Sequence, residues 1–410
     1  MDDYDFKNKT VLLRVDFNSD LDPQTKKILA APRIRQHGET TIKELVQKGA
    51  KVVILAHQGR PGDPTYAPLK EHAEFLSKVL GQPVQYVDDL FGERALNAIK
   101  HLKSGEVLVL ENVRDYPGEL KQGTPEEHAK SELIQKLAPL ADVFVDDAFS
   151  AAHRSHASIV GFTAVLPSVA GRIMEREINA LTRGLNSCQK PCLYLLGGAK
   201  ADDALKISQY VLKNDVADWV LTGGVVGNLF LVAKGFDLGE PSMQFLQKQQ
   251  LMGFVPGIQA MMEQYPGRVV VPMDVAVEVE GERHEFSVEL LPTEHQIFDI
   301  GSETIQKYIQ MIRDASSVVF SGPVGVFERG EFELGTRRIL EAIASSKAYS
   351  LIGGGDTVSA VEKYHLSSKM GYVTTAGGAL VEFLMGEKLP GVAALEEAAA
   401  RPDPLSRPRV

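Results

Sequence analysis

Short runs of branched and apolar residues recur along the chain, and longer amphipathic stretches separate them. Continuous apolar runs of this length are typical of strands buried on both faces of a parallel sheet, and the amphipathic stretches are typical of covering helices. The alternation therefore predicts an α/β fold with parallel sheets. No sequence repeat is evident. The predicted strands are residues 11–18, 52–57, 107–112 and 143–149 in the first half, and 193–198, 219–224, 269–274, 318–323 and 351–355 in the second.

The composition is that of a globular protein large enough for more than one domain. The chain has 410 residues, of which 44% are hydrophobic and 24% charged, so we expect two or three domains. Its formal net charge of −10 at pH 7 argues against a general nucleic-acid-binding protein. A function that depends on positive charge therefore has to be concentrated at a local site.

The sequence carries no sign of export or of membrane insertion. Its first ten residues are acidic and polar, and no run of about 18 apolar residues occurs. The two cysteines, Cys188 and Cys192, lie in the segment CQKPC, which lacks the further Cys or His partners of a zinc site. We therefore expect free thiols in a reducing compartment, and a cytoplasmic location.

In the first half of the chain, charged and polar side chains follow the predicted strands. Doubly wound sheets bind ligands at the carboxyl ends of their strands, and a guanidinium group binds carboxylate or phosphate oxygens in pairs. This edge therefore suits a small molecule that carries several negative oxygens, although a single arginine could equally form a surface ion pair. The side chains are Asp16, Asn18, His57, Arg60, Arg114 and Arg154, with Arg33 from the segment APRIRQ.

In the second half, the predicted strands end on glycines. Exposed backbone at such ends, where a helix begins, lets a phosphate chain approach closely, and the apolar flanks at residues 225–230 and 322–327 could hold a flat base. Together these features indicate a nucleotide site, although one Gly-Gly pair alone can be no more than a tight turn. The segments are Gly197–Gly198, Gly223–Gly224, Gly322–Pro323 and Gly353–Gly355.

Three acidic or imidazole features leave alternatives open. Asp356 follows the glycines and would repel an anion, unless Mg²⁺ lies between the two or Asp356 caps its own helix. Glu328 is either a turn charge or an acceptor for ribose hydroxyls. His153 and His156, close to Asp146 and Asp147 in the sequence, fit a packed loop better than a metal cluster.

The motifs along the chain resemble, in their order, those of the phosphoglycerate kinase family. The resemblance covers nearly the whole chain, whose length is similar to that of the shorter archaeal-type forms. It implies reversible transfer of the acyl phosphate of 1,3-bisphosphoglycerate to MgADP, which gives 3-phosphoglycerate and MgATP in glycolysis. The motifs are RVDFN (14–18), HQGRP (57–61), LENVR (110–114), DDAFSAAHRSH (146–156), GGAK (197–200), SGPVGVFE (321–328), GGGDT (353–357) and TTAGGA (374–379).

The resemblance also implies the architecture of the protein. The expected fold is two Rossmann-like domains with parallel sheets, joined by a hinge helix about which they close on the ligands. We expect a phosphoglycerate-binding domain over residues 1–168, an interdomain helix over 169–186, a nucleotide-binding domain over 187–388, and a tail over 389–410 that returns to the first domain. We expect a monomer whose partners are small molecules, with no nucleic acid and no membrane.

Carried over to this chain, the family pattern assigns residues to each ligand. The attacking carboxylate, with a pKa of about 4, is already ionised at neutral pH, so alignment and charge neutralisation suffice and no general base is needed. The implied substrate-binding residues are Asp16, Asn18, Arg33, His57, Gln58, Gly59, Arg60, Arg114 and Arg154. The implied nucleotide-binding residues are Lys200, Gly223, Glu328, Gly354, Gly355, Asp356 and Thr357, with Asp356 on Mg²⁺. Arg33, Lys200, Gly355 and Gly378 are the implied catalytic groups.

The chain departs from the family pattern at one basic position. The family's second lysine, expected four residues after Lys200, is Ala204 here, and Lys206 is its obvious substitute. If a helix begins near Lys200, each residue turns about 100°, so position 204 shares the face of Lys200 and position 206 does not. If ADD at 201–203 instead forms an irregular turn, Lys206 could reach the phosphates. The other departures remove no charged catalytic group; they are Ser19–Asp20, Gln58, Ser321 and Ala376, with Asp146 where Asn is common.

Other functions are disfavoured by motif. A Rossmann dehydrogenase needs Gly-x-Gly-x-x-Gly after its first strand, and a P-loop kinase needs Gly-x4-Gly-Lys-[Ser/Thr]; neither pattern is present. A non-catalytic binding protein of the same fold would keep the glycines and lose Arg33 or Lys200, and both are present.

Overall fold

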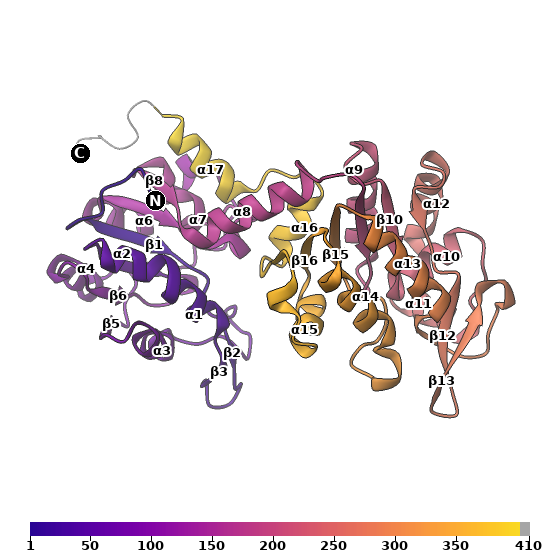
Figure 1. The fold of residues 1–410 in the computed structure, drawn as a ribbon. Coiled ribbons are helices and arrows are strands. Elements are labelled where there is room, and N and C mark those ends of the chain that lie inside the picture. Colours follow the sequence, from indigo (N-terminus) through magenta and orange to yellow (C-terminus); the bar gives the residue numbers. More distant parts are fainter. Residues whose placement is uncertain (402–410) are drawn as a thin grey trace. The chain divides into compact units, whose positions relative to one another are not determined.

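The computed structural model describes residues 1–401 of the chain, which divides into two compact units (Figure 1). The first unit consists of Met1–Ile178 and the C-terminal segment from Lys388, and the second of Asn179–Glu387. The chain passes from the first unit to the second within helix α8 (Arg172–Leu185). Of the expected C-terminal tail, residues 402–410 lie outside the described part.

The first unit is built on a six-stranded parallel sheet of order β5-β6-β4-β1-β7-β8. Four of its strands are the predicted ones; β5 and β8 were not predicted, because neither VQY at 84–86 nor SVA at 168–170 is a continuous apolar run. A short hairpin of β2 (Asp20–Leu21) and β3 (Ile28–Ala30) stands apart from the sheet. The strands are β1 (Thr10–Arg14), β4 (Lys51–Leu55), β5 (Val84–Tyr86), β6 (Val107–Val109), β7 (Val143–Asp146) and β8 (Ser168–Ala170).

Helices cover both faces of this sheet, because successive strand residues point to opposite sides. Val11 and Leu13 pack into the core beneath α1 and α3. Leu12 between them packs into the core on the other face, with Ile99 of α4 and Leu133 of α6. The helices are α1 (Pro32–His37), α2 (Lys43–Gln47), α3 (Lys70–Leu80), α4 (Glu93–His101), α5 (Pro125–His128), α6 (Glu132–Leu137) and α7 (Ala157–Val160), with a π-helical turn over Gly38–Ile42 between α1 and α2.

The C-terminal helix α17 (Pro390–Ala399), yellow in Figure 1, belongs to the first unit. Gly391 N–H donates to Ala152 O at 2.8 Å, and Ala394 packs among buried residues of α7. Arg401 Nη1 donates to Thr163 O at 2.6 Å. These contacts hold the described end of the chain on the first unit.

The second unit has its own six-stranded parallel sheet, of order β11-β10-β9-β15-β16-β17. All five predicted strands are present; only the two-residue β17 was not predicted. The strands are β9 (Cys192–Leu196), β10 (Trp219–Thr222), β11 (Val269–Val270), β15 (Ser317–Ser321), β16 (Tyr349–Gly353) and β17 (Tyr372–Val373). The helices are α9 (Ala201–Lys213), α10 (Gly224–Ala233), α11 (Glu240–Lys248), α12 (Val255–Gln264), α13 (Ser302–Asp314), α14 (Leu334–Ser345), α15 (Gly355–Lys363) and α16 (Gly378–Leu384).

An antiparallel sheet of three strands, of order β13-β12-β14, was absent from the prediction. Its strands are β12 (Asp274–Val279), β13 (Glu282–Ser287) and β14 (Ile297–Ile300). Glu280 and Gly281 join β12 to β13 with φ values of 53° and 85°. Positive φ at both central residues is the requirement of a tight hairpin turn, so the alternating pattern on either side of Glu-Gly was the signal that sequence reasoning missed.

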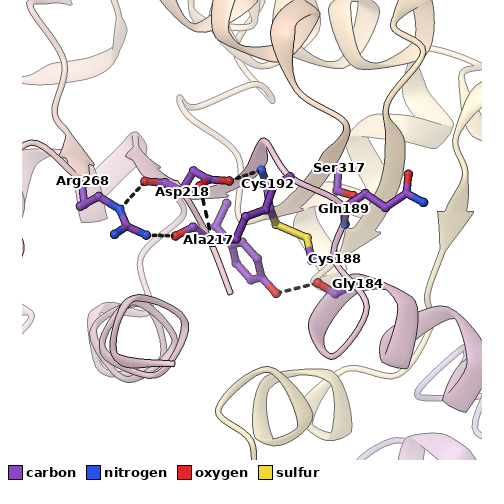
Figure 2. The surroundings of a disulfide bond; sticks show 10 residues. Gly184, Cys188, Gln189, Cys192, Ala217, Asp218, Arg268 and Ser317 are labelled. Atoms are coloured by element: carbon purple, nitrogen blue, oxygen red, sulfur yellow. Dashed lines mark hydrogen bonds and ion pairs between the residues drawn. A yellow bond between two sulfur atoms is a disulfide. The ribbon is translucent and has the colours of Figure 1, made fainter. Parts of the chain in front are cut away.

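The expectation of free thiols was wrong, because Cys188, in the loop after α8, forms a disulfide with Cys192, the first residue of β9 (Figure 2). The two Cα atoms lie 6.1 Å apart, well short of the roughly 13 Å that four residues span when extended. The loop is held in this fold by Gln189 N–H, which donates to Ser317 Oγ at 3.0 Å, and by Cys192 N–H, which donates to Asp218 Oδ2 at 2.7 Å. The spacing of the two cysteines in the sequence does not show that the loop brings them together.

Within residues 1–401, no helix is both long and apolar enough to cross a membrane.

Candidate functional site

The predicted basic residues of the first unit gather at the carboxyl edge of its sheet. The loops that carry them follow β1, β4, β6 and β7, which are neighbours in the sheet, and parallel neighbours end at the same edge. We call this group the arginine cluster: Arg33, Arg60, Arg114 and Arg154, with Asp16, Asn18 and His57 beside them.

Asp16 and Arg33 form an ion pair within the arginine cluster. Arg33 Nη1 lies 2.8 Å from Asp16 Oδ2, and Ser150 Oγ donates to the same oxygen. Asn18 N–H donates to Asp16 Oδ1 at 2.9 Å. Burial by itself would raise the pKa of Asp16, but Arg33 and the two donors outweigh it and lower the pKa to about 2. Asp16 is therefore an anion that holds the Arg33 guanidinium in place.

The loop after β4 is fixed by its own hydrogen bonds. Asn18 Oδ1 accepts from Gly59 N–H at 2.9 Å, which ties this loop to the loop after β1. A Cβ at Gly59, where φ is 62°, would lie 2.6 Å from Tyr66 N, so only glycine fits. Gln58 is completely buried and bonds to Ser19, Thr65 and His72. The predicted Gln58 side chain thus supports the loop and does not reach the surface of the cluster.

The arginines are close enough to act on one another. The pKa of Arg114 falls to about 10, first because the group is half-buried and then because Arg14, Arg154 and Arg60 repel its charge. Mutual repulsion of this kind is relieved when a ligand with several negative charges binds. The convergence that sequence reasoning could only suppose is therefore present.

Arg14 is a member of this region that sequence reasoning missed. It is the last residue of β1, is 2% exposed, and donates from Nε to Ser158 Oγ at 2.8 Å. The signal was its place inside the motif RVDFN, directly before the residues assigned to the ligand. His153 and His156 form no metal cluster, because residues 1–401 hold no group of three or more potential ligands. His156 is buried, and burial lowers its pKa to about 3.

The second unit contains two adjoining cavities at the carboxyl edge of its sheet. The first has a volume of about 170 Å³ and the second about 140 Å³. Gly198, Ala199 and Asp356 line both, so the two meet along a shared wall.

The first cavity is mainly apolar. The strand ends and α10 supply the walls predicted from the sequence, among them Val225 and Val324. The antiparallel sheet supplies the opposite wall with Val275 and residues 297–300, which no sequence pattern had indicated. Glu328 lies at this cavity and is exposed. The cavity thus has mainly apolar walls and a carboxylate among its lining residues.

The second cavity is lined by glycines and by Lys200. The start of α15 forms one wall, with Gly354, Gly355, Asp356 and Thr357, and the start of α16 forms another, with Gly377 and Gly378. The first N–H groups of a helix have no partner within it, so both starts suit an anion. Thr357 is engaged, because its Oγ1 accepts from Gly322 N–H at 2.7 Å.

Asp356 does not cap its helix. The N-cap of α15 is Gly354, with φ of 85°, and Asp356 lies two residues later, exposed in the first turn. This geometry excludes the capping explanation and leaves a carboxylate beside an anion site. Mg²⁺ is usually held by one or two carboxylates together with phosphate and water oxygens, so a lone Asp356 fits a magnesium ion that arrives with a nucleotide.

Lys200 lies immediately before α9, as its N-cap residue. Ala204 is buried in the wall of the second cavity together with Lys200. Lys206 lies on the exposed side of the helix, where its Nζ is 2.7 Å from Asp202 Oδ2. The helix is regular from Ala201, so the irregular turn is excluded.

Several of the strand-end glycines are used for close packing. Gly198 N–H donates to Pro323 O at 2.8 Å, and Gly224 N–H donates to Val324 O at 2.7 Å. Gly223 does not line either cavity; a Cβ there would lie 2.6 Å from the Cβ of Val324. Gly223 therefore serves to bring the strand ends together, whereas Gly197, Gly198 and Gly224 also line the cavities, as do the glycines at the starts of α15 and α16.

Known proteins resemble this chain over almost its full length. The family model for phosphoglycerate kinase matches residues 1–387. The phosphoglycerate kinase of Methanobacterium bryantii is 46% identical over 397 residues, which cover 97% of each chain, and that of Methanothermus fervidus is 43% identical over 403 residues, which cover 98% of each. The crystal structure of the Pyrococcus horikoshii OT3 enzyme has a TM-score of 0.89 at 42% identity, over 97% of this chain and 98% of that one.

Proposed function

The chain belongs to the phosphoglycerate kinase family and catalyses reversible phosphoryl transfer between 1,3-bisphosphoglycerate and ADP in glycolysis; from this premise, we propose that the arginine cluster binds the phosphoglycerate and that the two cavities bind the nucleotide. The observation that supports the nucleotide assignment is the shared wall of the cavities. An apolar slot that opens directly onto a glycine-lined anion site matches a base and ribose joined to a phosphate chain.

Within the nucleotide site, each group has a proposed part. The base lies in the first cavity, and Glu328 accepts from the ribose hydroxyls. The phosphates lie in the second cavity against Lys200 and the N–H groups of Gly354, Gly355 and Thr357. Gly223 supports this site through packing.

Asp356 would hold the Mg²⁺ that accompanies the nucleotide. When bound, the ion neutralises phosphate charge. Asp356 supplies the carboxylate that lines both cavities, and its side chain is exposed.

At the arginine cluster, the ligand's negative oxygens bind to Arg60, Arg114 and Arg154, with Asn18 and His57 as further polar contacts. Gly59 lets the backbone approach, and Gln58 fixes the loop from behind. Asp16 orients Arg33.

Catalysis rests on charge neutralisation. The carboxylate of 3-phosphoglycerate is ionised at neutral pH and attacks without a base. Arg33, Lys200 and the N–H groups of Gly355 and Gly378 stabilise the phosphoryl group in transfer. Arg33 belongs to the first unit, and the other three groups belong to the second.

We further propose that the enzyme is a monomer and that it works in the cytoplasm, where its nucleotide and glycolytic substrates are found. The disulfide is uncommon for reducing compartments, although intracellular proteins of hyperthermophiles often contain such bonds. Sedimentation velocity tests the first statement, and alkylation of thiols in rapidly quenched cells tests the oxidation state of Cys188 and Cys192 in place.

Calorimetry with each ligand separately tests the division into two sites. We expect Arg154→Ala to weaken binding of 3-phosphoglycerate roughly tenfold or more and to leave MgADP binding nearly unchanged. Glu328→Gln should show the reverse, and the exposed Glu331→Gln is its matched control. Comparable loss of both ligands in either variant would contradict the proposal.

A further inference from the structure

Arg14 is buried at the end of β1 with all of its guanidinium nitrogens engaged. Nε donates to Ser158 Oγ at 2.8 Å, Nη1 donates to Val15 O, and Nη2 lies 3.2 Å from His57 Nδ1. Ser158 is fixed in turn by the buried Glu119, whose Oε1 accepts from Ser158 Oγ at 2.6 Å and whose Oε2 accepts from Ser158 N–H at 2.9 Å. Ser158 and Glu119 thus hold the guanidinium in place from the side that faces away from His57.

This contact determines which nitrogen of His57 carries the proton. A guanidinium group has only donors, and it stays protonated in proteins. His57 Nδ1 must therefore accept the hydrogen bond from Arg14, and an accepting ring nitrogen has no proton. A neutral imidazole with a bare Nδ1 carries its hydrogen on Nε2. Within residues 1–401, Nε2 forms no hydrogen bond, and His57 retains 8% exposure.

We propose that Arg14 is a positioning residue for the reaction: it fixes His57 as the neutral Nε2–H tautomer, so that His57 presents a hydrogen-bond donor to an oxygen of the bound phosphoglycerate. This inference rests on the proposed assignment of the arginine cluster to that ligand. The donor matters because the ligand's carboxylate and phosphate oxygens are acceptors. The other tautomer would turn a lone pair toward them and repel the ligand.

The cations that face His57 favour its neutral form, and one carboxylate opposes them. Burial is the main reason that the pKa of His57 lies well below its usual range, and the cations Arg14, Arg114 and Arg33 add to the effect. Asp16 opposes them. The ring therefore stays neutral around neutral pH, and its role as a donor does not depend on protonation.

The proton position can be measured directly in the unaltered protein. Long-range ¹H–¹⁵N correlation spectra of the free enzyme should show His57 with a protonated Nε2, a bare Nδ1 and no titration between about pH 8 and about pH 6. Addition of 3-phosphoglycerate should shift the Nε2 resonance. A proton on Nδ1, or titration in this range, would overturn the inference and leave the assignment of the arginine cluster intact. An unshifted Nε2 would instead overturn the proposed contact between His57 and the ligand.

Kinetics of variants separates positioning from a merely structural role. In Arg14→Met, both tautomers become accessible and His57 becomes easier to protonate, so the KM for 3-phosphoglycerate should rise roughly tenfold at high pH and recover as the pH falls. The KM for MgADP should not change. Ser158→Ala, which removes a support of Arg14 and keeps its donor to His57, is the matched control and should keep a flat profile.

A second variant guards against misfolding. Arg14→Met leaves Glu119 buried without the cation that acts on it most strongly, whereas Arg14→Met/Glu119→Gln removes both charges together. The double variant should show the same rise in KM with pH. A rise in KM that is equal at every pH, with the tautomer unchanged, would show that Arg14 only stabilises the fold.

Discussion

Lys206 is paired with Asp202 on the exposed side of α9, with 2.7 Å between Nζ and Oδ2, and it therefore points away from the second cavity. Lys200 and Ala204 line that cavity, one helical turn apart. The position at which the family carries its second lysine thus lines the second cavity here with a methyl group, and Lys206, the nearest lysine in the sequence, does not line that cavity.

Lys206→Ala should therefore have little effect on catalysis. We expect its kcat and its KM for MgATP to change less than about threefold, whereas Lys200→Ala should lower kcat at least about tenfold, near 1.4 kcal/mol. Steady-state kinetics of both variants measures this. A loss in Lys206→Ala that matches the loss in Lys200→Ala would contradict the orientation seen in the structure.

Arg33→Ala should lower kcat by orders of magnitude and change the KM for 3-phosphoglycerate less. The reason is that a cation on the moving phosphoryl group acts mainly in the transition state. Arg35→Ala is the matched control, since Arg35 lies in the same helix and contacts Glu39 and the Phe75 ring instead of Asp16. An unchanged kcat in Arg33→Ala would remove this residue from catalysis.

Asp356→Asn should raise the Mg²⁺ concentration needed for half-maximal activity, because a neutral amide holds the ion more weakly than a carboxylate. Since the N-cap of α15 is Gly354 and Asp356 is exposed in the first turn, the melting temperature should change little, by no more than the loss of one charge near the helix N-terminus causes. Magnesium titrations and thermal unfolding are the measurements, with Asp202→Asn as a control outside the cavity. Lower stability with an unchanged magnesium requirement would revive the capping role.

Asp146→Asn should stabilise the protein at neutral and higher pH. Asp146 is completely buried, its Oδ2 has no partner, and its Oδ1 accepts from Ala148 N–H at 3.0 Å. Burial raises the pKa of Asp146 from 3.8 to about 7, and the neighbouring Asp147 contributes in the same direction.

The direction in which stability changes with pH follows from the protons that the folded and unfolded states bind. Between about pH 4 and about pH 7, the folded protein keeps a proton on Asp146 that the unfolded chain releases, so stability falls as pH rises through this window. An amide in place of this carboxyl does not titrate, so the substitution would remove the loss of stability that occurs as the pH rises. The variant should melt a few degrees above the wild type at pH 8, and the difference should shrink toward pH 4. A variant that is equal or less stable at pH 8 would show that the buried carboxyl finds compensation elsewhere.

The sequence by itself determined the fold class and the motif-bearing residues. Runs such as residues 52–57 can only be buried strands, because an uncharged β-branched segment of that length gains free energy chiefly when both of its faces leave water. The order of motifs from RVDFN to TTAGGA then identified the family. Local pattern also predicted the face of α9, because helical geometry repeats whatever the surroundings are.

Tertiary structure decided everything that depends on which chain segments meet. The Cys188–Cys192 disulfide, the wall that β12 and β14 give to the first cavity, and the contact between Arg14 and His57 each join groups brought together by a turn or by sheet order. None of these contacts leaves a periodic trace in the sequence. The proton on His57 is the clearest case: the residue type permits either tautomer, and only a donor from the neighbouring strand selects one.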